Sequence, residues 1–524
     1  MIGIVNYGAG NLQSLLNALE KSNHEYFMIE KGEDMSLEMD LCLFPGVGHF
    51  DHAIKNLHAK NLFEPLKQYI KSNKPYFGIC IGMQVLFESS EEGELKGLCI
   101  FNDRVVKMTP NRPVPHMGWN LMYPKTYHNL DYQKHFYFVH SFAVVNKNQN
   151  WVHSTCCYGD LEFVSSIQQS NVFATQFHPE KSGKLGLELI NAIVDKLPFL
   201  TVTASDFNKQ DNLTKRILSC LDVREDEDGE LVVTKGYGYD VRDQIDGKIR
   251  NIGNPIALSR KYYEAQVDEL CFLSIKSYNT NPLDTPLMKL LRKVSKEIFV
   301  PLTIGGGISD KLVDRNGEEV LIKAVEIASA YFKAGADKVS IGSDAVKSVL
   351  KYLEKGISEC GISDISKAYG NQAVVVSIDP KRHFIKETEI TKIENLGFTV
   401  LTFTDKRPCY YAATIHGGRS VSPLCAIQLA KYSQILGAGE LLVNCIDEDG
   451  KGNGFDLVLL KAIRSAVSIP IIASSGAGKQ SHFVDAFGID CDAALAAGIF
   501  HRDEVSIESI KEECRRNEIK TRLF

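Results

Sequence analysis

The second half of this sequence repeats itself, and that repeat limits the possible folds more than any other feature does. The segment RILSCLDV, which ends near Asp222, resembles QAVVVSIDPKR around Asp379, at an offset of 157 residues. ELCFLSI resembles ELLVNCI at an offset of 171 residues, and VPLTIGGG resembles IPIIASSG at an offset of 169. Each segment is a short apolar run with a helical stretch after it. The repeat therefore predicts four βα units followed by four similar ones.

Eight such units favour a (β/α)8 barrel of the TIM type, made of two similar halves. Parallel strands need crossover connections, and eight of them close into a barrel whose active site lies at the C-terminal strand ends. A doubly wound open sheet is the alternative for the same alternation of strands and helices. One barrel accounts for about 250 residues, and the chain has 524. The first part of the sequence therefore requires a second domain.

The first part alternates short apolar strands with helical stretches, which is typical of an α/β domain. The runs IGIV, LCLF and YFGIC each end in a glycine-containing turn, and such runs suit parallel strands that are buried on both faces. Beyond Leu197 the stretch PFLTVTASDFNKQDN interrupts both periods. We therefore predict an α/β domain at residues 1–200, a linker at 201–213 and the barrel at 214–524.

The composition excludes several classes of protein. A formal charge of −6 provides no basic face for nucleic acid, so any phosphate that the protein binds should belong to a small molecule. No apolar run reaches the roughly 18 residues of a transmembrane helix, and the opening MIGIVNYG lacks the basic region of a signal peptide. The thirteen cysteines include no C-x-x-C pair, which indicates a reducing compartment. We expect a cytoplasmic protein that binds neither nucleic acid nor membranes.

One cysteine has the surroundings of a nucleophile. In KPYFGICIGMQVLF, Cys80 stands between Gly78 and Gly82, after an apolar strand and before a helical stretch. Glycines on both sides permit the sharp strand-to-helix turn that presents a nucleophile, and a following helix N-terminus favours a thiolate. The alternative for a single cysteine is a small residue of the core.

The string QFHPEKSG supplies partners for that thiol. His178 is a candidate general base toward Cys80, and Glu180 is a candidate for orienting the imidazole. Pro179 between them restricts His178 to an extended backbone. In this order the cysteine turn and the His-Pro-Glu string resemble the class I glutamine amidotransferase family.

That resemblance covers the whole first domain and implies a role for one more loop. In LFPGVGHF, the residues Gly46, Val47 and Gly48 follow a strand, where the family supplies oxyanion-hole amides. The alternative is an ordinary turn between a strand and a helix.

Two aspartates follow matched strands of the repeat. Asp222 and Asp379 come at the ends of predicted strands 1 and 5, which face each other across a barrel of eight strands. Two carboxylates so placed can divide acid and base roles if their surroundings separate their pKa values. The alternative for either residue is a cap on the following helix. We predict that Asp222 is the base and Asp379 the acid, although the sequence does not order them.

Glycine-rich turns occur once in each half of the barrel. They lie at LTIGGGIS, with Gly306 and Gly307, and at ASSGAGK, with Ser475 and Gly476. Backbone amides at a helix N-terminus hold a phosphate without a positive side chain, and glycine allows close approach. Two such turns on opposite sides of one barrel predict a substrate with a phosphate at each end. Tight turns without a ligand are the alternative.

Further strings narrow the family. VPHMGWN, FYFVHSF and NYGAGN resemble the glutaminase of the imidazole glycerol phosphate synthase family, and CLDV and SIDPKR resemble its cyclase. The resemblance implies that a Cys-His-Glu triad hydrolyses glutamine and that the ammonia reacts with a bis-phosphate ribonucleotide. This substrate is a formimino-linked aminoimidazole carboxamide ribonucleotide with a phosphoribulosyl arm. The products are imidazole glycerol phosphate, aminoimidazole carboxamide ribonucleotide and glutamate, in histidine biosynthesis.

The resemblance also assigns residues at the barrel mouth. It implies that Lys235, Ser343 and Asp449 line the cyclase site. The chain departs from the bacterial pattern of the family in three places, and these departures resemble the fused eukaryotic form. They are Ser274, Gly342 and Gly498.

Four charged residues stand at the beginnings of predicted strands. Arg216, Glu269, Lys338 and Glu440 fall on strands 1, 2, 4 and 6. Charges at this end of a barrel commonly concern stability or are ordinary surface groups. Two acids and two bases aimed at one axis can instead form a neutral ring of salt bridges, and the resemblance implies that this ring is an ammonia gate. We expect the glutaminase to dock on that face.

The resemblance implies small-molecule substrates, glutamine and the bis-phosphate ribonucleotide, with no cofactor and no metal. Fusion in one chain removes the need for a separate glutaminase subunit, and we expect a monomer. A pyridoxal phosphate synthase also joins such a glutaminase to a barrel, but it needs a Schiff-base lysine in place of the paired aspartates. A glutamine sensor without catalysis is the other alternative. An activated thiol counts against a sensor, because binding alone does not require one.

Overall fold

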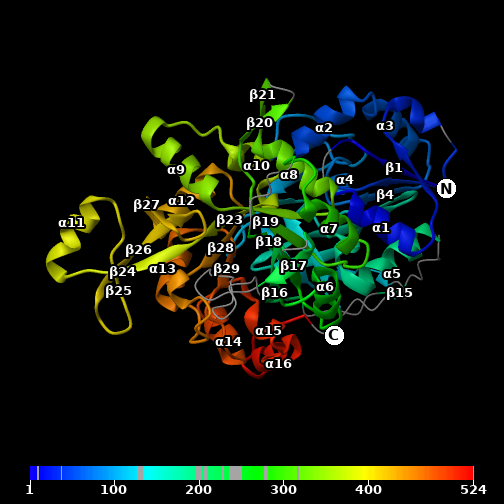
Figure 1. Cartoon of the computed structure of the whole chain (residues 1–524). Helices are drawn as coiled ribbons and strands as arrows, with labels where there is room; N and C mark the ends of the chain where they lie inside the picture. The colour runs from blue at the N-terminus through cyan, green and yellow to red at the C-terminus, as the bar shows by residue number, and fades with distance from the viewer. Residues whose placement is uncertain are drawn as a thin grey trace.

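The computed structural model describes most of the chain and shows two domains (Figure 1). The described residues are 1–8, 11–36, 38–124, 126–127, 134–195, 202–203, 209–226, 229–234, 251–275, 281–315 and 318–522. None of the helices in these ranges combines the length and the apolar character that crossing a bilayer requires.

The N-terminal domain is built on a mixed sheet, which has eight strands in the described part of the chain. In spatial order they are β2 (Tyr26–Ile29), β1 (Ile2–Val5), β3 (Leu41–Phe44), β4 (Tyr76–Ile79), β14 (Val172–Thr175), β13 (Leu161–Gln169), β12 (Val152–Tyr158) and β8 (Tyr123–Pro124). The first five strands pair with their neighbours in parallel. The three pairings that follow, β14 with β13, β13 with β12 and β12 with β8, are antiparallel. The strands IGIV, LCLF and YFGI are fully buried, as expected of parallel strands covered on both faces.

The described helices of this domain come from the parts of the chain around the parallel strands. They are α1 (Gln13–Lys21), α2 (Phe50–Ala59), α3 (Phe63–Lys71), α4 (Ile81–Gln84) and α5 (Gly183–Val194), with the short turns η1 (Gly32–Ser36) and η2 (Pro179–Lys181). Between α4 and η2 the described residues form strands and turns instead. The predicted alternation of strands and helices is therefore wrong for that stretch, where hairpin connections replace the crossover helices.

Smaller sheets complete the domain. The described strands outside the main sheet are β5 (Ser89–Ser90), β6 (Arg104–Lys107), β7 (His116–Asn120), β9 (Thr126–Tyr127), β10 (Phe136–His140), β11 (Phe142–Ala143) and β15 (Val202–Thr203). The strings HMGWN and FYFVH, which carried the family resemblance, are β7 and β10, and they pair with each other in antiparallel register.

The C-terminal domain is a closed barrel. Among the described residues eight parallel strands follow one another around it: β16 (Arg216–Glu225), β18 (Glu269–Ser274), β19 (Leu302–Gly305), β22 (Lys338–Ile341), β23 (Val374–Ile378), β28 (Glu440–Asn444), β29 (Ile471–Ser474) and β30 (Ala493–Ala496). The last strand pairs with the first, with Arg216 opposite Ala493. This pairing confirms the barrel and excludes the open sheet, and β23 begins the second half at the predicted repeat.

Helices surround the barrel and connect its strands. They are α6 (Pro255–Glu264), α7 (Pro286–Val294), α8 (Ala324–Lys333), α9 (Ser343–Lys355), α10 (Gly361–Tyr369), α12 (Ala426–Leu436), α13 (Leu457–Ala466), α14 (Gln480–Gly488), α15 (Gly498–His501) and α16 (Ile507–Arg516), with the short turns η3 (Asn371–Ala373) and η5 (Ile446–Glu448). One continuous apolar core joins these helices to the outer faces of the strands.

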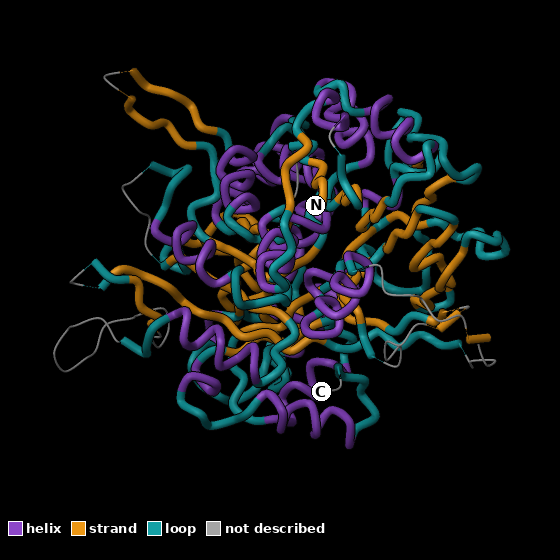
Figure 2. Tube along the Cα trace, turned by 90° about the vertical axis from the view of Figure 1, so that its right-hand side faces the viewer, coloured by secondary structure: helices purple, strands orange, loops and turns teal. Residues whose placement is uncertain are grey.

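Insertions after the strands depart from the repeat. Strand β17 (Leu231–Thr234) pairs with β16, and a hairpin of β20 (Lys311–Arg315) and β21 (Glu318–Ile322) follows β19 and stands out from the barrel (Figure 2). A larger insertion follows β23 and contains β24 (Pro380–Phe384), η4 (Glu387–Glu389), α11 (Ile390–Asn395), β25 (Leu401–Thr402), β26 (Pro408–Ile415) and β27 (Ser420–Cys425). Figure 1 shows this insertion at the left, on the side away from the N-terminal domain.

The N-terminal domain docks on the face where the barrel strands begin. Asn11 Nδ2 donates to Asp337 Oδ1 at 2.8 Å, and Lys181 Nζ lies 2.6 Å from Asp337 Oδ2. Trp119 Nε1 donates to the backbone oxygen of Asp268 at 3.1 Å. Asp268 and Asp337 immediately precede β18 and β22, so the predicted docking face is confirmed.

Candidate functional site

The nucleophile candidate sits on a strained turn between β4 and α4. Cys80 has a φ of 52° and is 5% exposed, a backbone conformation that residues with a side chain rarely adopt. A Cβ on Gly78 would lie 2.4 Å from the backbone oxygen of Gly82, and one on Gly82 would lie 2.2 Å from that of Phe44. Glycine is therefore required on both sides, and the tight turn lifts the thiol out of the strand.

His178 and Glu180 lie together in the buried interior. His178 Nδ1 donates to Glu180 Oε1 at 2.8 Å, with side-chain exposures of 3% and 7%. The backbone of His178 is held from both sides, because its N–H donates to Tyr137 and its carbonyl accepts from Ser182 Oγ. The bond to Glu180 fixes the ring orientation and leaves Nε2 as the nitrogen available to a reacting group.

The charges around His178 favour its protonated form. Burial lowers the pKa of His178, but Glu180 and the sulfur of Cys80 outweigh it and raise this pKa to about 10. Since the Cys80 sulfur contributes to the shift, the two side chains lie within electrostatic reach of each other. An imidazolium beside a sulfur suits nucleophilic catalysis by that cysteine.

Two glutamines that the sequence interpretation missed complete this cluster. Gln176 Nε2 donates to Cys80 Sγ at 3.4 Å, and Gln84 Nε2 donates to Gln176 Oε1 at 3.1 Å. The string QFHPE could have indicated Gln176, because it precedes His178 by two residues. In an extended backbone, side chains two residues apart point to the same side of the chain. These amides orient the sulfur.

The predicted oxyanion loop lies beside the same turn. A Cβ on Gly46 would lie 2.3 Å from Ile81 Cγ2, and Ile81 follows Cys80 directly. Tyr7 OH donates to the backbone oxygen of Val47 at 2.8 Å, while Gly48 continues the loop with a φ of 155°. The loop is therefore close to the thiol, with the Val47 carbonyl held by a tyrosine.

Replacing Glu180 with glutamine should lower the pKa of His178, because the carboxylate charge that raises it is lost. In the wild type the folded state keeps a proton that the unfolded state releases above its ordinary pKa of 6.5. The resulting stabilisation is complete below pH 6.5 and is lost as the pH rises through about 10. The free energy of unfolding, measured across this range, should fall less steeply in the variant, and an NMR titration of the His178 ring should show the lower pKa. Equal slopes in the two proteins would contradict the proposed pair.

The four charged residues at the strand beginnings form a closed ring. Arg216 Nη1 lies 2.8 Å from Glu269 Oε2, and its other terminal nitrogen pairs with Glu440. Lys338 Nζ lies 2.6 Å from both Glu269 Oε1 and Glu440 Oε2, and all four side chains are at most 1% exposed. Burial raises the pKa of Glu440, but Arg216 and Lys338 outweigh it and lower this pKa. The ring is thus neutral and held in place by its own ion pairs.

A cavity between the domains links the His178 cluster with this ring. Groups from both domains line it. The lining residues are Val47, Tyr137, Val139, His178, Lys181, Asp337, Lys338, Gln372 and Ala373. One continuous space therefore touches the imidazole of the first domain and a lysine of the ring.

The barrel interior above the ring is largely apolar. The inward positions of β16 are Arg216, Leu218, Cys220 and Asp222, since alternate residues of a strand share a face. The charged ring and the aspartate thus lie at opposite ends of the same strand face, about 20 Å apart at about 3.3 Å per residue. The buried apolar cluster between them consists of Leu218, Cys220, Cys271, Val375, Leu442, Ile472, Ala493, Leu495 and Ala497.

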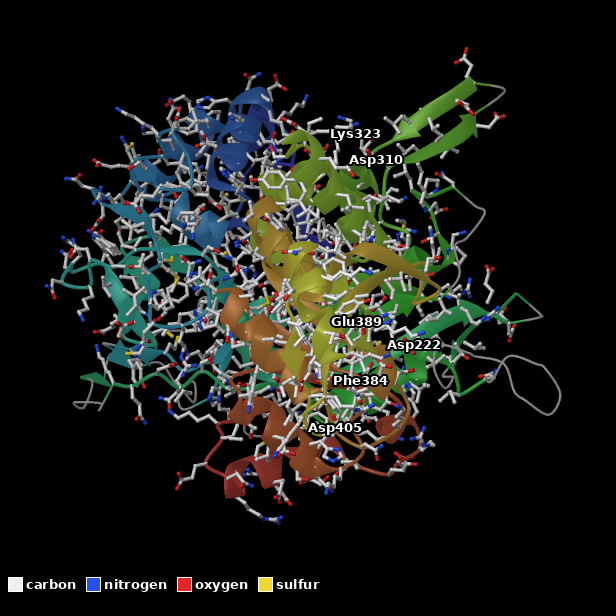
Figure 3. The ribbon with its side chains drawn as sticks, turned by 90° about the vertical axis from the view of Figure 1, so that its left-hand side faces the viewer. Asp222, Asp310, Lys323, Phe384, Glu389 and Asp405 are labelled. Atoms are coloured by element: carbon white, nitrogen blue, oxygen red, sulfur yellow. The ribbon has the colours of Figure 1, made fainter. Side chains whose placement is uncertain are left out.

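The two predicted aspartates lie at the other end of the barrel. Asp222 is near the end of β16 and 9% exposed, and Asp379 follows β23, four strands away around the closed ring. Figure 3 labels Asp222 on the side where the insertion after β23 projects. Asn444 Nδ2 donates to Asp379 Oδ1 at 3.0 Å. Burial and then Asp449 raise the pKa of Asp379, against the hydrogen bonds from Asn444 and Ser377, which lower it.

An arginine that the sequence interpretation missed organises the loop next to Asp379. Arg382 Nη2 lies 2.6 Å from both Glu448 Oε1 and Asp456 Oδ2, and its backbone N–H donates to Asp447 at 2.6 Å. These bonds tie β24 to the loop after β28, which carries Asp449. The string SIDPKR contained the signal, because a charged side chain so soon after a catalytic candidate falls at the same barrel mouth.

The two glycine turns lie at the predicted strand ends, but their helices differ from the expectation. Gly306 and Gly307 have φ values of +104° and +74°, and the β20–β21 hairpin separates them from α8. The helix that begins beside this turn is α9, which starts at Ser343 on the neighbouring strand connection. Ser343 Oγ accepts from the backbone N–H of His416 at 2.9 Å.

The second turn is joined to the loop after β28. Ser475 and Gly476 have φ values of +68° and +98°. The backbone N–H of Gly454 donates to the oxygen of Gly476 at 2.8 Å, and α14 begins only at Gln480. The sequence predicted that each glycine turn leads directly into a helix N-terminus. This prediction is wrong for both turns, since additional residues separate the glycines from the next helix.

The three departures from the bacterial pattern, Ser274, Gly342 and Gly498, have different surroundings. A Cβ on Gly306 would lie 2.7 Å from the oxygen of Ser274, whereas one on Gly342 would meet nothing within 4 Å. A Cβ on Gly498 would lie 2.8 Å from Arg502 Nη1.

Lys235, which the sequence places at the cyclase site, lies outside the described residues. Within the described ranges no three His, Cys, Asp or Glu side chains converge as a candidate metal site.

Comparison with protein families divides the chain into the same two parts. A family model described as "Glutamine amidotransferase class-I" matches residues 3–196. A second model, described as "Histidine biosynthesis protein", matches residues 216–506.

Similar proteins in other organisms cover the whole chain or the barrel alone. The chain is 42% identical to "Imidazole glycerol phosphate synthase hisHF" of Emericella nidulans, over 98% of this chain and 97% of the relative. It is 43% identical to "Imidazole glycerol phosphate synthase hisHF, chloroplastic" of Arabidopsis thaliana, over 100% of this chain and 90% of the relative. The "Imidazole glycerol phosphate synthase subunit HisF" of Methanocaldococcus jannaschii is 38% identical, over 60% of this chain and 100% of the relative.

Proposed function

Because the chain belongs to the imidazole glycerol phosphate synthase family in its fused form, we propose that ammonia released at Cys80 crosses the barrel to Asp222 and Asp379. The enzyme is a bifunctional glutamine amidotransferase and cyclase of histidine biosynthesis. Its substrates are small molecules, and the fusion removes the need for a separate glutaminase subunit.

In the glutaminase step, the thiolate of Cys80 attacks the carboxamide carbon of glutamine. His178 gives a proton to the departing nitrogen, so that ammonia leaves and a thioester remains. Water then hydrolyses the thioester to glutamate and restores the thiol. The bond from His178 Nδ1 to Glu180 supports this assignment, because it leaves Nε2 to exchange the proton. The position of the loop Gly46–Gly48 beside Cys80 supports a role in binding the oxyanion.

The single observation that carries the coupling of the two steps is the cavity lined by both His178 and Lys338. Ammonia released from the Cys80 adduct, beside His178, enters this cavity directly. Near neutral pH free ammonia is mostly ammonium, which cannot act as a nucleophile, so an enclosed path preserves the reactive form. The apolar interior of the barrel favours neutral ammonia over the charged ion.

In the cyclase step, ammonia attacks the ribulosyl carbonyl of the substrate to give an imine and water. We assign Asp379 as the acid that helps water leave, and its raised pKa supports this role. Asp222 is then the base that removes protons as the imidazole ring closes and aminoimidazole carboxamide ribonucleotide departs. The residues Gly306, Gly307 and Ser343 hold one phosphate, and Ser475, Gly476 and Asp449 lie at the other end of the substrate. Their places at opposite sides of the barrel mouth support this assignment.

We propose domain limits of 1–200 and 214–524 with a linker between them, supported by family matches that leave out residues 197–215. A monomer is sufficient for the proposed reaction, since both sites and the path between them belong to one chain. All thirteen cysteines are free thiols, which supports a reducing compartment such as the cytoplasm.

Replacing Lys338 with methionine should affect the glutamine-dependent reaction more than the ammonia-dependent one, because external ammonia can enter at the barrel mouth. Removing one cation also leaves a net negative charge buried in the ring, and breaking such a network costs about 3–5 kcal/mol of stability. Steady-state rates with each nitrogen source and denaturant unfolding measure the two effects. Lys215→Met is the matched control, since Lys215 lies beside Arg216 but pairs with Asp490 outside the ring. Equal losses of both rates would contradict a path through the ring.

A further inference from the structure

One lysine places its ammonium over the first glycine turn. Lys311 is the first residue of β20, four positions after Gly307. Its Nζ lies 3.3 Å from the position that a Cβ on Gly307 would occupy. No other atom of the described residues, apart from those of the adjacent residues, comes within 4 Å of that position. The space above the turn is therefore open except for this cation.

The ammonium of Lys311 has no partner among the described residues. The side chain is half-buried, and burial lowers its pKa. The buried lysines in the described part of the chain have carboxylates: Lys338 has Glu269 and Glu440, Lys511 pairs with Asp268, and Lys181 pairs with Asp337. A partly desolvated cation without a counter-charge is unfavourable unless an anion arrives.

The surroundings of the turn suit a phosphate. Gly305 pairs with Ser340 of β22, so the turn lies next to Gly342 and the N-terminus of the 13-residue helix α9. Helix N-termini favour anions through their free N–H groups. A Cβ on Gly342 would meet nothing within 4 Å, so this side of the site is open as well.

The base of the hairpin is fixed, which gives Lys311 a defined position. Asp310 Oδ1 accepts a hydrogen bond from the backbone N–H of Ala324 at 2.8 Å, at the start of α8. Lys311 pairs in register with Ile322, which is buried in the barrel core. Figure 3 shows Asp310 and Lys323 at the base of the hairpin, whose far end extends away from the barrel.

We propose that Lys311 is a ligand for one phosphate of the bis-phosphate substrate, and that the hairpin after β19 supplies this cation to the glycine turn. The inference rests on the proposed function and extends it. Backbone amides contribute only partial charges, whereas a lysine brings a full charge to the dianion. Phosphate recognition at this turn then differs from the expectation that backbone amides suffice.

The test compares Lys311→Met with the wild type in the ammonia-dependent cyclase reaction of the full chain. Loss of a charged hydrogen bond should raise KM for the bis-phosphate substrate about tenfold or more, while kcat stays within about twofold. Lys311→Arg should retain most of the affinity. Lys323→Met, on the exposed side of the same hairpin base, is the matched control and should leave KM unchanged.

A second measurement separates this inference from the proposed function. Binding of inorganic phosphate to the wild type and to Lys311→Met, followed by ³¹P NMR, does not depend on turnover. Weaker phosphate binding in the variant supports the inference, whether or not the enzyme has cyclase activity. Absence of cyclase activity in the wild type would refute only the proposed function. Unchanged phosphate binding, an unchanged KM, or an equal rise of KM in Lys323→Met would overturn the role of Lys311.

Discussion

Replacing Cys80 with alanine should abolish glutamine-dependent synthesis and leave ammonia-dependent synthesis intact. The alanine cannot form the thioester, and loss of a nucleophile from such a triad lowers kcat by about 10⁴ or more. The cyclase site lies at the far end of the barrel, about 20 Å beyond the ring, and does not contact Cys80. The measurement is the rate of imidazole glycerol phosphate formation with glutamine and, separately, with ammonium at high pH.

A second cysteine provides the control for this variant. Cys157 on β12 is 8% exposed, close to the 5% of Cys80, and lies outside the His178 cluster. Cys157→Ala should therefore retain both activities. Loss of the ammonia-dependent rate in Cys80→Ala would show that the two active sites do not divide the reaction as proposed.

Replacing Asp379 with asparagine should remove cyclisation with both nitrogen sources. Asparagine keeps the shape of the side chain and can still form hydrogen bonds with Asn444 and Ser377. It has no acidic proton, and loss of general acid catalysis lowers the rate by about 10²–10⁴. Asp222→Asn should have a similar effect through loss of the base. Rates with ammonium, at saturating bis-phosphate substrate, measure the loss without any contribution from the glutaminase.

An exposed aspartate serves as the comparison. Asp405 lies in the insertion after β23, where Figure 3 labels it, and pairs with Arg407. Asp405→Asn should leave both rates unchanged. If Asp379→Asn kept its ammonia-dependent activity, Asp379 could not be the acid, and its raised pKa would reflect only its burial and the nearby charge of Asp449.

The barrel and the line of residues through it could be predicted from the sequence, because both follow from periodicity. The repeat fixed the number and order of the strands. The period of two along RILSCLD placed Arg216 and Asp222 on one face, with apolar residues between them. Strong local patterns of this kind survive folding, since burial of one face leaves a single register.

Other features depend on contacts between distant segments and left weaker traces. The pairing of Lys181 with Asp337 joins the two domains. Each residue stands beside a predicted site residue, but no local pattern indicates that the two meet. The antiparallel strands β12 and β13 contain a buried histidine, His153, and buried serines, and they show no clear apolar alternation. The hairpin that carries Lys311 interrupts a βα unit, so the repeat, which compares strands, does not report it.

The measurement that tests the central claim most directly is an isotope competition in the wild-type enzyme. The reaction is run with ¹⁵N-glutamine and an excess of unlabelled ammonium, and the label in the imidazole product is measured by mass spectrometry. If ammonia passes from Cys80 through the ring formed with Lys338 to Asp379, the product should keep most of the glutamine label despite the excess. A product whose label is diluted to the level of the bulk ammonium would contradict passage through the barrel.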